Sequence, residues 1–351
     1  MIYSLRSFLL VTVLSLGFCS AQRPSPRRSP SYPWFPFAWY SEQINGKLVE
    51  KLAILVPVKV NDLRGNFVMQ FDLGSDATTV YENTVAPYFA NHTQLYALVD
   101  TAQHGLSDSG LRSYRTRGLA LTLGPLRIPH PRLTAKFGDP VSPDSLYTTS
   151  QKLAGTIGGD IFAGKVLVID YPHQRMCVLD SMDAYWRTRT RFVTSQVKEN
   201  RFTIPLTIGQ RTYRALFDTG SSLFALDTDE AQWKGLVKPG ARVDSMLVNS
   251  WGKQVPYYGA PMRANAYLGS LQLPPAHAWF TRDPRHLAFA QAERIDGITG
   301  NALFVNDIIV LDFKQHRFGV VKHQRTETKK KGETGEVMTN QLGCGTKGGL
   351  G

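Results

Sequence analysis

An internal repeat constrains the fold of this chain more than any other feature. Four blocks recur in the same order: Ile54–Val60 and Phe202–Ile208, Phe71–Ser75 and Phe217–Ser221, Leu123–Leu126 and Leu268–Leu271, Gly155–Tyr171 and Gly297–Phe313. The two copies of each block lie 142 to 148 residues apart, a drift that differences in loop length would produce. Four blocks in one order indicate two copies of the same lobe rather than two unrelated domains.

Each copy has the residue pattern of β structure. Six segments alternate between apolar and polar residues or are continuously apolar over strand lengths: Leu52–Val60, Asn66–Phe71, Leu119–Leu123, Arg201–Ile208, Tyr213–Phe217 and Ile308–Leu311. Turn-forming residues at Asn61–Gly65 and Gly209–Arg211 predict hairpins. Helical periodicity is confined to Asp227–Leu236 and to a segment that begins at Gln151. The sequence therefore predicts an all-β protein with short helices.

The ends of the chain differ from the repeat. Residues 1–21 have a basic start, the apolar stretch Phe8–Phe18 and small residues at their end, which is the pattern of a signal peptide. Residues 22–48 are a Pro/Ser/Arg-rich linker and N-terminal segment, and residues 325–351 are a polar tail that we expect to be disordered. No later segment is apolar over a length that spans a bilayer. We therefore expect a secreted or extracytoplasmic protein with no membrane contact after signal removal.

The repeat and the ends divide the chain into an N-terminal lobe at 49–181, an inter-lobe connection at 182–200 and a C-terminal lobe at 201–324. The formal net charge of +12 would suit a nucleic-acid partner. Half of it lies in the signal, the linker and the tail, which leaves +6 for residues 34–324. That is an ordinary basic surface, and we expect no nucleic-acid partner.

Each copy carries one acidic turn at the end of an apolar strand. An apolar strand delivers Asp72 or Asp218 to a tight turn, a glycine lets the backbone double back, and hydroxyl groups can hydrogen-bond the carboxylate. A single turn of this kind is typical of a protein surface. Two such turns one lobe apart, each with an apolar block ending in glycine further along its lobe, indicate a shared site instead.

At these residues the sequence resembles the pepsin-like aspartic proteases, and its lobe endings are also similar to the retropepsin type. The matching motifs are Asp72-Leu73-Gly74-Ser75, Asp218-Thr219-Gly220-Ser221, Thr156-Ile157-Gly158-Gly159-Asp160 and Ile298-Thr299-Gly300-Asn301-Ala302. The similarity spans roughly Val49–Lys322. It implies a bilobal all-β fold, in which two pseudo-twofold related, β-barrel-like lobes bring Asp72 and Asp218 together at the floor of a cleft.

The resemblance also implies an activity, that of a secreted aspartic endopeptidase acting on peptides or proteins through a water activated by Asp72 and Asp218. The supporting loop residues would be Gly74, Ser75, Thr219, Gly220 and Ser221, with both serine hydroxyls bonded to the carboxylates and Thr219 reaching across to the opposite loop. Tyr114 lies 42 residues after the first aspartate and is the candidate for the flap that closes the cleft. We expect a monomer that needs no metal and no cofactor.

The sequence departs from the family pattern at Leu73, where the family has Thr or Ser. This removes half of the hydrogen bonding that grips the two loops together. The alternative function is therefore a catalytically impaired pseudoprotease that binds extended peptides in the same cleft. Other enzyme classes lack their motifs: there is no H-E-x-x-H or paired-cysteine metal pattern and no G-x-S-x-G elbow. Asn91-His92-Thr93 is a glycosylation sequon.

Overall fold

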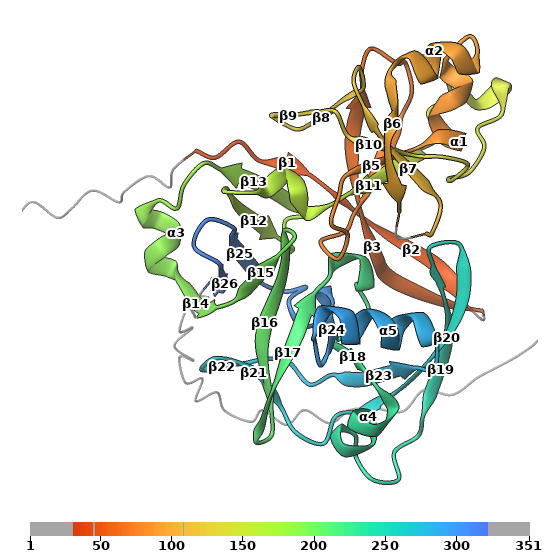
Figure 1. Ribbon diagram of the computed structural model, residues 1–351. Coiled ribbons are helices and arrows are strands. Elements are labelled where there is room, and N and C mark those ends of the chain that lie inside the picture. The colour runs from red at the N-terminus through yellow and green to blue at the C-terminus, as the bar shows by residue number, and fades with distance from the viewer. Residues whose placement is uncertain (1–30, 45, 108, 322–351) are drawn as a thin grey trace, which may run out of the picture.

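The computed structural model describes residues 31–44, 46–107 and 109–321 (Figure 1). The predicted signal peptide at 1–21, the linker up to residue 30 and the polar tail at 325–351 lie outside the described residues. Among the helices of the described part, none has the length and apolar character needed to cross a membrane.

The first half of the chain forms a ten-stranded sheet in the N-terminal lobe and part of a central sheet. Its strands are β1 (Phe35–Pro36), β2 (Ala38–Ile44), β3 (Lys47–Val60), β4 (Phe67–Phe71), β5 (Thr79–Tyr81), β6 (Val99–Leu106), β7 (Arg112–Thr116), β8 (Ala120–Leu123), β9 (Leu126–Pro129), β10 (Arg132–Thr134), β11 (Lys152–Ile157), β12 (Val166–Asp170) and β13 (Arg175–Leu179). The short helices α1 (Glu82–Val85) and α2 (His92–Ala97) lie in this lobe.

The second half repeats this plan in the C-terminal lobe. Its strands are β14 (Thr190–Thr194), β15 (Gln196–Lys198), β16 (Arg201–Ile208), β17 (Arg211–Phe217), β18 (Leu226–Thr228), β19 (Asp244–Ser250), β20 (Lys253–Pro261), β21 (Ala266–Leu268), β22 (Leu271–Gln272), β23 (His277–Thr281), β24 (Gly297–Thr299), β25 (Ile308–Asp312) and β26 (Arg317–Val321). The helices are α3 (Ala184–Arg189), which connects the halves, α4 (Glu230–Leu236) and α5 (Pro284–Glu293).

The two lobe sheets have the same strand order. The N-terminal order is β6-β7-β10-β5-β11-β4-β3-β8-β9, and the C-terminal order is β19-β20-β23-β18-β24-β17-β16-β21-β22. Each strand of the first half has its counterpart thirteen strands later. The duplication predicted from four sequence blocks therefore extends over the whole fold. The predicted fold class is confirmed in its all-β, bilobal and duplicated architecture.

A six-stranded sheet joins the lobes, in the order β1-β13-β12-β25-β26-β14 (Figure 1). At its centre β12 pairs antiparallel with β25, and Val168 lies opposite its own repeat equivalent, Val310. The pseudo-twofold axis therefore passes between these two residues. Two equivalent ion pairs flank this centre: Asp170 Oδ2 lies 2.8 Å from Arg175 Nε, and Asp312 Oδ2 lies 2.7 Å from the guanidinium of Arg317.

In the structure, the strands of both copies of the repeat begin earlier in the chain than the sequence predicts. Strands β1 and β2 lie in the segment 22–48, and β14 and β15 lie in the connection 182–200. Strands β1 and β15 are very short, the side chains of β2 are mainly solvent-exposed, and Thr190 is the one fully buried residue of β14. These strands therefore lack the apolar pattern by which the other strands are detected.

Two helix predictions need correction. The segment after Gln151 is strand β11, which pairs with β4 on one side and β5 on the other. It is buried on both faces, so its nearly continuous apolar run has no period of two. The helix predicted for Asp227–Leu236 begins only at Glu230, because Asp229 is its N-cap and accepts a hydrogen bond from the backbone N–H of Gln232.

Helix α5 was not predicted, although its start carries a clear signal. Asp283 caps it by accepting from the backbone N–H of Arg285, and Pro284 occupies its first turn. Its hydrophobic face is weak, since none of its residues is fully buried. The apolar periodicity that identifies most helices is therefore missing.

Candidate active site

The two acidic turns are delivered by equivalent strands. Strand β4 ends at Phe71 and β17 ends at Phe217, and both rings are completely buried. Each strand pairs in parallel with the strand that carries the apolar block ending in glycine, β11 or β24. These blocks then hold the turns: the N–H of Asp72 donates to Ile157 O at 3.0 Å, and the N–H of Asp218 donates to Thr299 O at 2.9 Å.

Thr219 ties the second loop to the first. Its hydroxyl donates to Phe71 O at 2.8 Å and accepts from the N–H of Leu73 at 2.9 Å. The side chain is completely buried. Leu73, the equivalent residue in the first loop, is also buried and has no hydroxyl, so it cannot make the reciprocal pair of bonds. The loops are therefore clamped by one threonine instead of two.

Each carboxylate is held by its own loop. Asp72 Oδ1 accepts from the N–H groups of Gly74 and Ser75, at 2.9 and 3.2 Å. Asp218 Oδ1 accepts from the N–H of Gly220 at 2.7 Å, and its Oδ2 accepts from the Ser221 hydroxyl at 2.8 Å.

The glycines show how closely the two loops approach. A Cβ atom on Gly74 would lie 2.4 Å from Cγ of Asp218, and one on Gly220 would lie 2.6 Å from Cγ of Asp72. Each carboxyl group therefore packs against the backbone of the opposite loop, where only glycine leaves room for it. The fold brings Asp72 and Asp218 to one place, although they are 146 residues apart in the chain.

The block after β24 provides further support that the sequence did not reveal. Asn301 donates from Nδ2 to Thr219 O at 3.1 Å and to the Ser222 hydroxyl at 3.0 Å, and its Oδ1 accepts from the Tyr171 hydroxyl at 2.6 Å. The equivalent of Asn301 in the first copy is Gly159. This difference between the copies was the one signal for Asn301, and its meaning depends on partners from distant segments.

In the first lobe, Asp160 rather than an asparagine holds the loop that carries the aspartate. Asp160 Oδ1 accepts from both the N–H and the hydroxyl of Thr78, at 2.9 and 2.7 Å. Burial is the largest influence on Asp160 and raises the pKa of its carboxyl group, while the Thr78 bonds oppose it. This contact fixes the end of the first loop against the block after β11.

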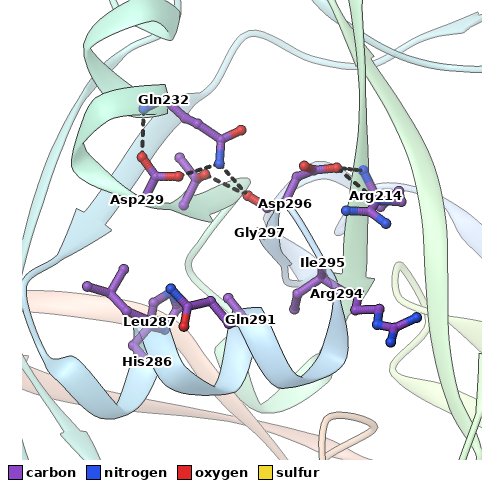
Figure 2. A pocket seen from close by; sticks show the side chains of 12 residues that line it. Arg214, Asp229, Gln232, His286, Leu287, Gln291, Arg294, Ile295, Asp296 and Gly297 are labelled. Atoms are coloured by element: carbon purple, nitrogen blue, oxygen red, sulfur yellow. Dashed lines mark hydrogen bonds and ion pairs between the residues drawn. The ribbon is translucent and has the colours of Figure 1, made fainter.

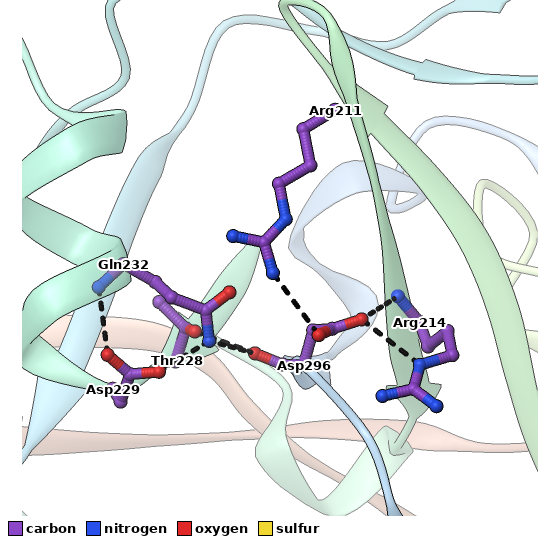
Figure 3. A network of polar contacts seen from close by, with 6 residues as sticks. All are labelled: Arg211, Arg214, Thr228, Asp229, Gln232 and Asp296. Carbon is purple, nitrogen blue, oxygen red and sulfur yellow. Dashed lines mark hydrogen bonds and ion pairs between the residues drawn. The ribbon is translucent and has the colours of Figure 1, made fainter.

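A polar network outside the turns holds the start of β24 (Figure 3). Asp296 accepts from the backbone N–H of Arg214 at 2.8 Å and pairs with the guanidinium groups of Arg214 and Arg211 at 3.2 and 3.3 Å. The Thr228 hydroxyl donates to Asp296 O at 2.6 Å. Strands β17, β18 and β24 are thus tied together next to the turn that carries Asp218.

The structure places Tyr114 in β7 of the β6–β7 hairpin, with its side chain nearly buried. Its ring packs edge-on against Tyr96 with centroids 6.1 Å apart and lies at the same distance from the ring of His104. The equivalent hairpin of the second lobe is β19–β20 (Figure 1). At its tip Trp251 contacts Phe137 of the N-terminal lobe, with ring centroids 6.1 Å apart, so this hairpin bridges the lobes.

The loop clamp gives a first testable prediction. Thr219→Val keeps the shape of the side chain but leaves the N–H of Leu73 and the carbonyl of Phe71 without the hydroxyl. We expect the free energy of unfolding to fall by about 2–4 kcal/mol, measured by urea denaturation, because both groups are buried. The matched control is Thr207→Val in β16, where the half-buried side chain's hydroxyl bonds the Thr212 hydroxyl. A change within about 0.5 kcal/mol is expected there, and equal losses in the two variants would refute the clamp.

No family model matches the sequence, and no curated protein matches it. Among solved structures, the chain is similar to basic 7S globulin from soybean, with 11% identity over 83% of this chain and 96% of the other and a TM-score of 0.40. For conglutin gamma from lupine seeds the values are 9%, 84%, 96% and 0.42. For an aspartic proteinase from Irpex lacteus they are 13%, 84%, 98% and 0.42. The sheet topology and the two paired loops of the chain itself define its fold.

Proposed function

We propose that this chain is a secreted aspartic endopeptidase in which Asp72 and Asp218 activate the attacking water. The observation that carries the proposal is the reciprocal packing of the two loops, with each carboxyl group against the glycine of the opposite turn. Two acidic side chains from symmetry-related strands then share one small site, which a purely structural turn does not require.

Such a pair supplies both the base and the acid that peptide hydrolysis needs. Two neighbouring carboxyl groups cannot both ionise cheaply, so they share one proton and titrate as a pair. The ionised group takes a proton from the water as its oxygen attacks the scissile carbonyl carbon, and the protonated group donates to the carbonyl oxygen. As the C–N bond of the tetrahedral intermediate breaks, the carboxyl group that is now protonated gives its proton to the leaving nitrogen. The other carboxylate takes a proton from a hydroxyl of the intermediate, so the pair again holds one proton.

A peptide in extended form is the substrate that best suits a cleft between two β lobes. The β6–β7 hairpin with Tyr114 would cover it and exclude water from the reacting bond. The bridge between Trp251 and Phe137 would bound the site on the other lobe.

The competing function is peptide binding without hydrolysis, and Leu73 is the observation that favours it. Hydrolysis of a mixed peptide library over about pH 3–7, with and without a statine-type inhibitor, separates the two functions. Inhibitor-sensitive cleavage supports the protease. Retention of peptides without cleavage at every pH supports the binding protein.

Leu73→Thr tests whether the single clamp limits activity. The substitution gives up about 1–2 kcal/mol of apolar burial and offers up to two new hydrogen bonds of about 1 kcal/mol each. We expect unfolding free energy within about 1 kcal/mol of wild type and hydrolysis that is maintained or raised. The matched control is Leu73→Val, which has the same shape as threonine but no hydroxyl. If the valine variant equals or exceeds the threonine variant in stability and activity, the hydroxyl adds nothing.

A further inference from the structure

A third acidic side chain lies buried near Asp218 without an arginine or lysine partner. Asp227 in β18 is 1% exposed, its Oδ1 makes no hydrogen bond within the described part of the chain, and its Oδ2 lies 3.4 Å from Nε2 of His286 on α5. Asp170 and Asp312 are buried to the same degree, but each is paired with an arginine. A buried carboxylate without such a partner is costly, and the group reduces this cost by keeping its proton.

The first lobe has no acid at the equivalent position. Asp227 lies opposite Ile298 in the sheet, and Thr79 lies opposite Thr156, the repeat equivalent of Ile298. The Thr79 hydroxyl shares a hydrogen bond with the Thr134 hydroxyl at 2.7 Å. In the second lobe Ile298 has no polar group to offer Asp227.

Tyr257 connects this acid with the catalytic turn. Its ring stacks on Phe224 in the loop that follows Asp218, with centroids 4.5 Å apart, and its phenol interacts with the Asp227 carboxyl group. Burial is the largest cause that raises the pKa of the Tyr257 phenol, followed by the negative charges of Asp227 and Asp218. Burial also raises the pKa of Asp227 well above its usual value, and the charge of Asp218 adds to this effect.

We propose that Asp227 is a positioning residue that supports the Asp218 loop as a neutral carboxylic acid and thereby restricts the stable site to acidic pH. This inference rests on the proposed function only where it concerns hydrolysis. When Asp227 loses its proton, a carboxylate that no arginine or lysine neutralises remains between β23 and β24, where Trp279 and Ile298 are its neighbours in the sheet. The loop beside it is then destabilised.

The charged groups around Asp227 do not compensate this charge. Burial lowers the pKa of His286, which disfavours the charged imidazolium next to the Asp227 carboxyl group. Asp283 and Arg285, at the start of α5, form an ion pair with each other. The remaining titratable neighbours are Tyr257 and Asp218.

Solvent protons can reach His286, and through it Asp227, without passing the turns that carry Asp72 and Asp218. His286 lies in the wall of a half-open cavity of about 530 Å³, between α5 and the starts of β24 and α4 (Figure 2). Neither Asp72 nor Asp218 lines it. The protonation of Asp227 and His286 can therefore adjust to the pH while a peptide occupies the site.

The direction of the pH effect follows from the raised pKa. A carboxyl group that holds its proton more tightly in the folded chain contributes stability below its unfolded-state pKa, near 3.8. This contribution is lost as the pH rises from that value through the folded-state pKa. Asparagine carries no charge at any pH, so Asp227→Asn should remove this loss.

The test compares thermal unfolding of wild type, Asp227→Asn and Asp312→Asn between about pH 4 and pH 7.5. We expect the melting temperature of Asp227→Asn to exceed that of wild type by about 2–5 °C at the upper end and the difference to vanish at the lower end. Asp312→Asn is the matched control. It removes an equally buried carboxylate, but it leaves Arg317 without its ion-pair partner. It should melt below wild type at the upper end. Parallel curves for wild type and Asp227→Asn would overturn the proposal.

A second measurement covers the case in which Asp227→Asn does not fold. In protein labelled with ¹³C at the aspartate carboxyl carbons, in the Asp218→Asn background, the assigned Asp227 signal should stay at the protonated position after the exposed aspartates have ionised. Ionisation of Asp227 together with the exposed aspartates would contradict the inference. If wild type hydrolyses peptide, Asp227→Asn should retain activity longer during incubation at neutral pH. If wild type is inert, the proposed function fails while the unfolding and NMR results still decide the role of Asp227.

Discussion

Asp218→Asn is expected to lower kcat/KM for peptide hydrolysis by at least about 10³-fold, because the pair can no longer hold and transfer one shared proton. The amide has the shape of the carboxyl group, and its oxygen can still accept from the N–H of Gly220. The protein should therefore stay folded, with a melting temperature within a few degrees of wild type. Activity and thermal unfolding must be measured on the same preparation.

Two further variants make this result specific. Asp72→Asn should cause a loss of the same order, and the double variant should be little worse than either single one, because the two groups act as a unit. Asp62→Asn changes an exposed aspartate in the turn after β3 and should leave hydrolysis within about twofold of wild type. Undiminished cleavage by Asp218→Asn would refute the mechanism.

Gly300→Ala is the second substitution with a large expected effect. A Cβ atom there would lie 1.9 Å from Ser221 O and 2.6 Å from the carbonyl carbon of the same residue. The φ of Gly300 is −96°, outside the left-handed region that favours glycine, so the expected loss is attributed to the clash. We expect a loss of about 3–5 kcal/mol in unfolding free energy, measured in urea, together with loss of hydrolysis as the Asp218 loop is displaced.

The control is a glycine in open surroundings. Gly235 lies in α4, and no atom would come within 4 Å of a Cβ placed on it. Gly235→Ala should leave the protein as stable as wild type or more stable by about 0.5–1 kcal/mol, because alanine favours the helix. Similar effects of the two substitutions would mean that Gly300 is not held against the Ser221 backbone.

The sequence was sufficient to predict the duplicated all-β fold, because the four blocks lie in strands that recur in the same order in both sheets. It failed where a segment lacks its usual period. Strand β11 is buried on both faces and resembled a helix, and α5 is a helix with little buried surface. Strands β1, β2, β14 and β15 complete each copy, but they carry too few buried apolar residues to be detected.

What the sequence alone determined is the chemistry of each turn: a carboxyl group at the end of a buried strand, then glycine and hydroxyl groups. These features depend on neighbours within a few residues, so local patterns encode them. What only the tertiary structure decided is which groups meet. Packing of Asp72 against Gly220, the single clamp of Thr219 and the neighbours of Asp227 all depend on segments far apart in the chain. The partners of a buried polar group come from long-range pairing, and one chain position does not reveal them.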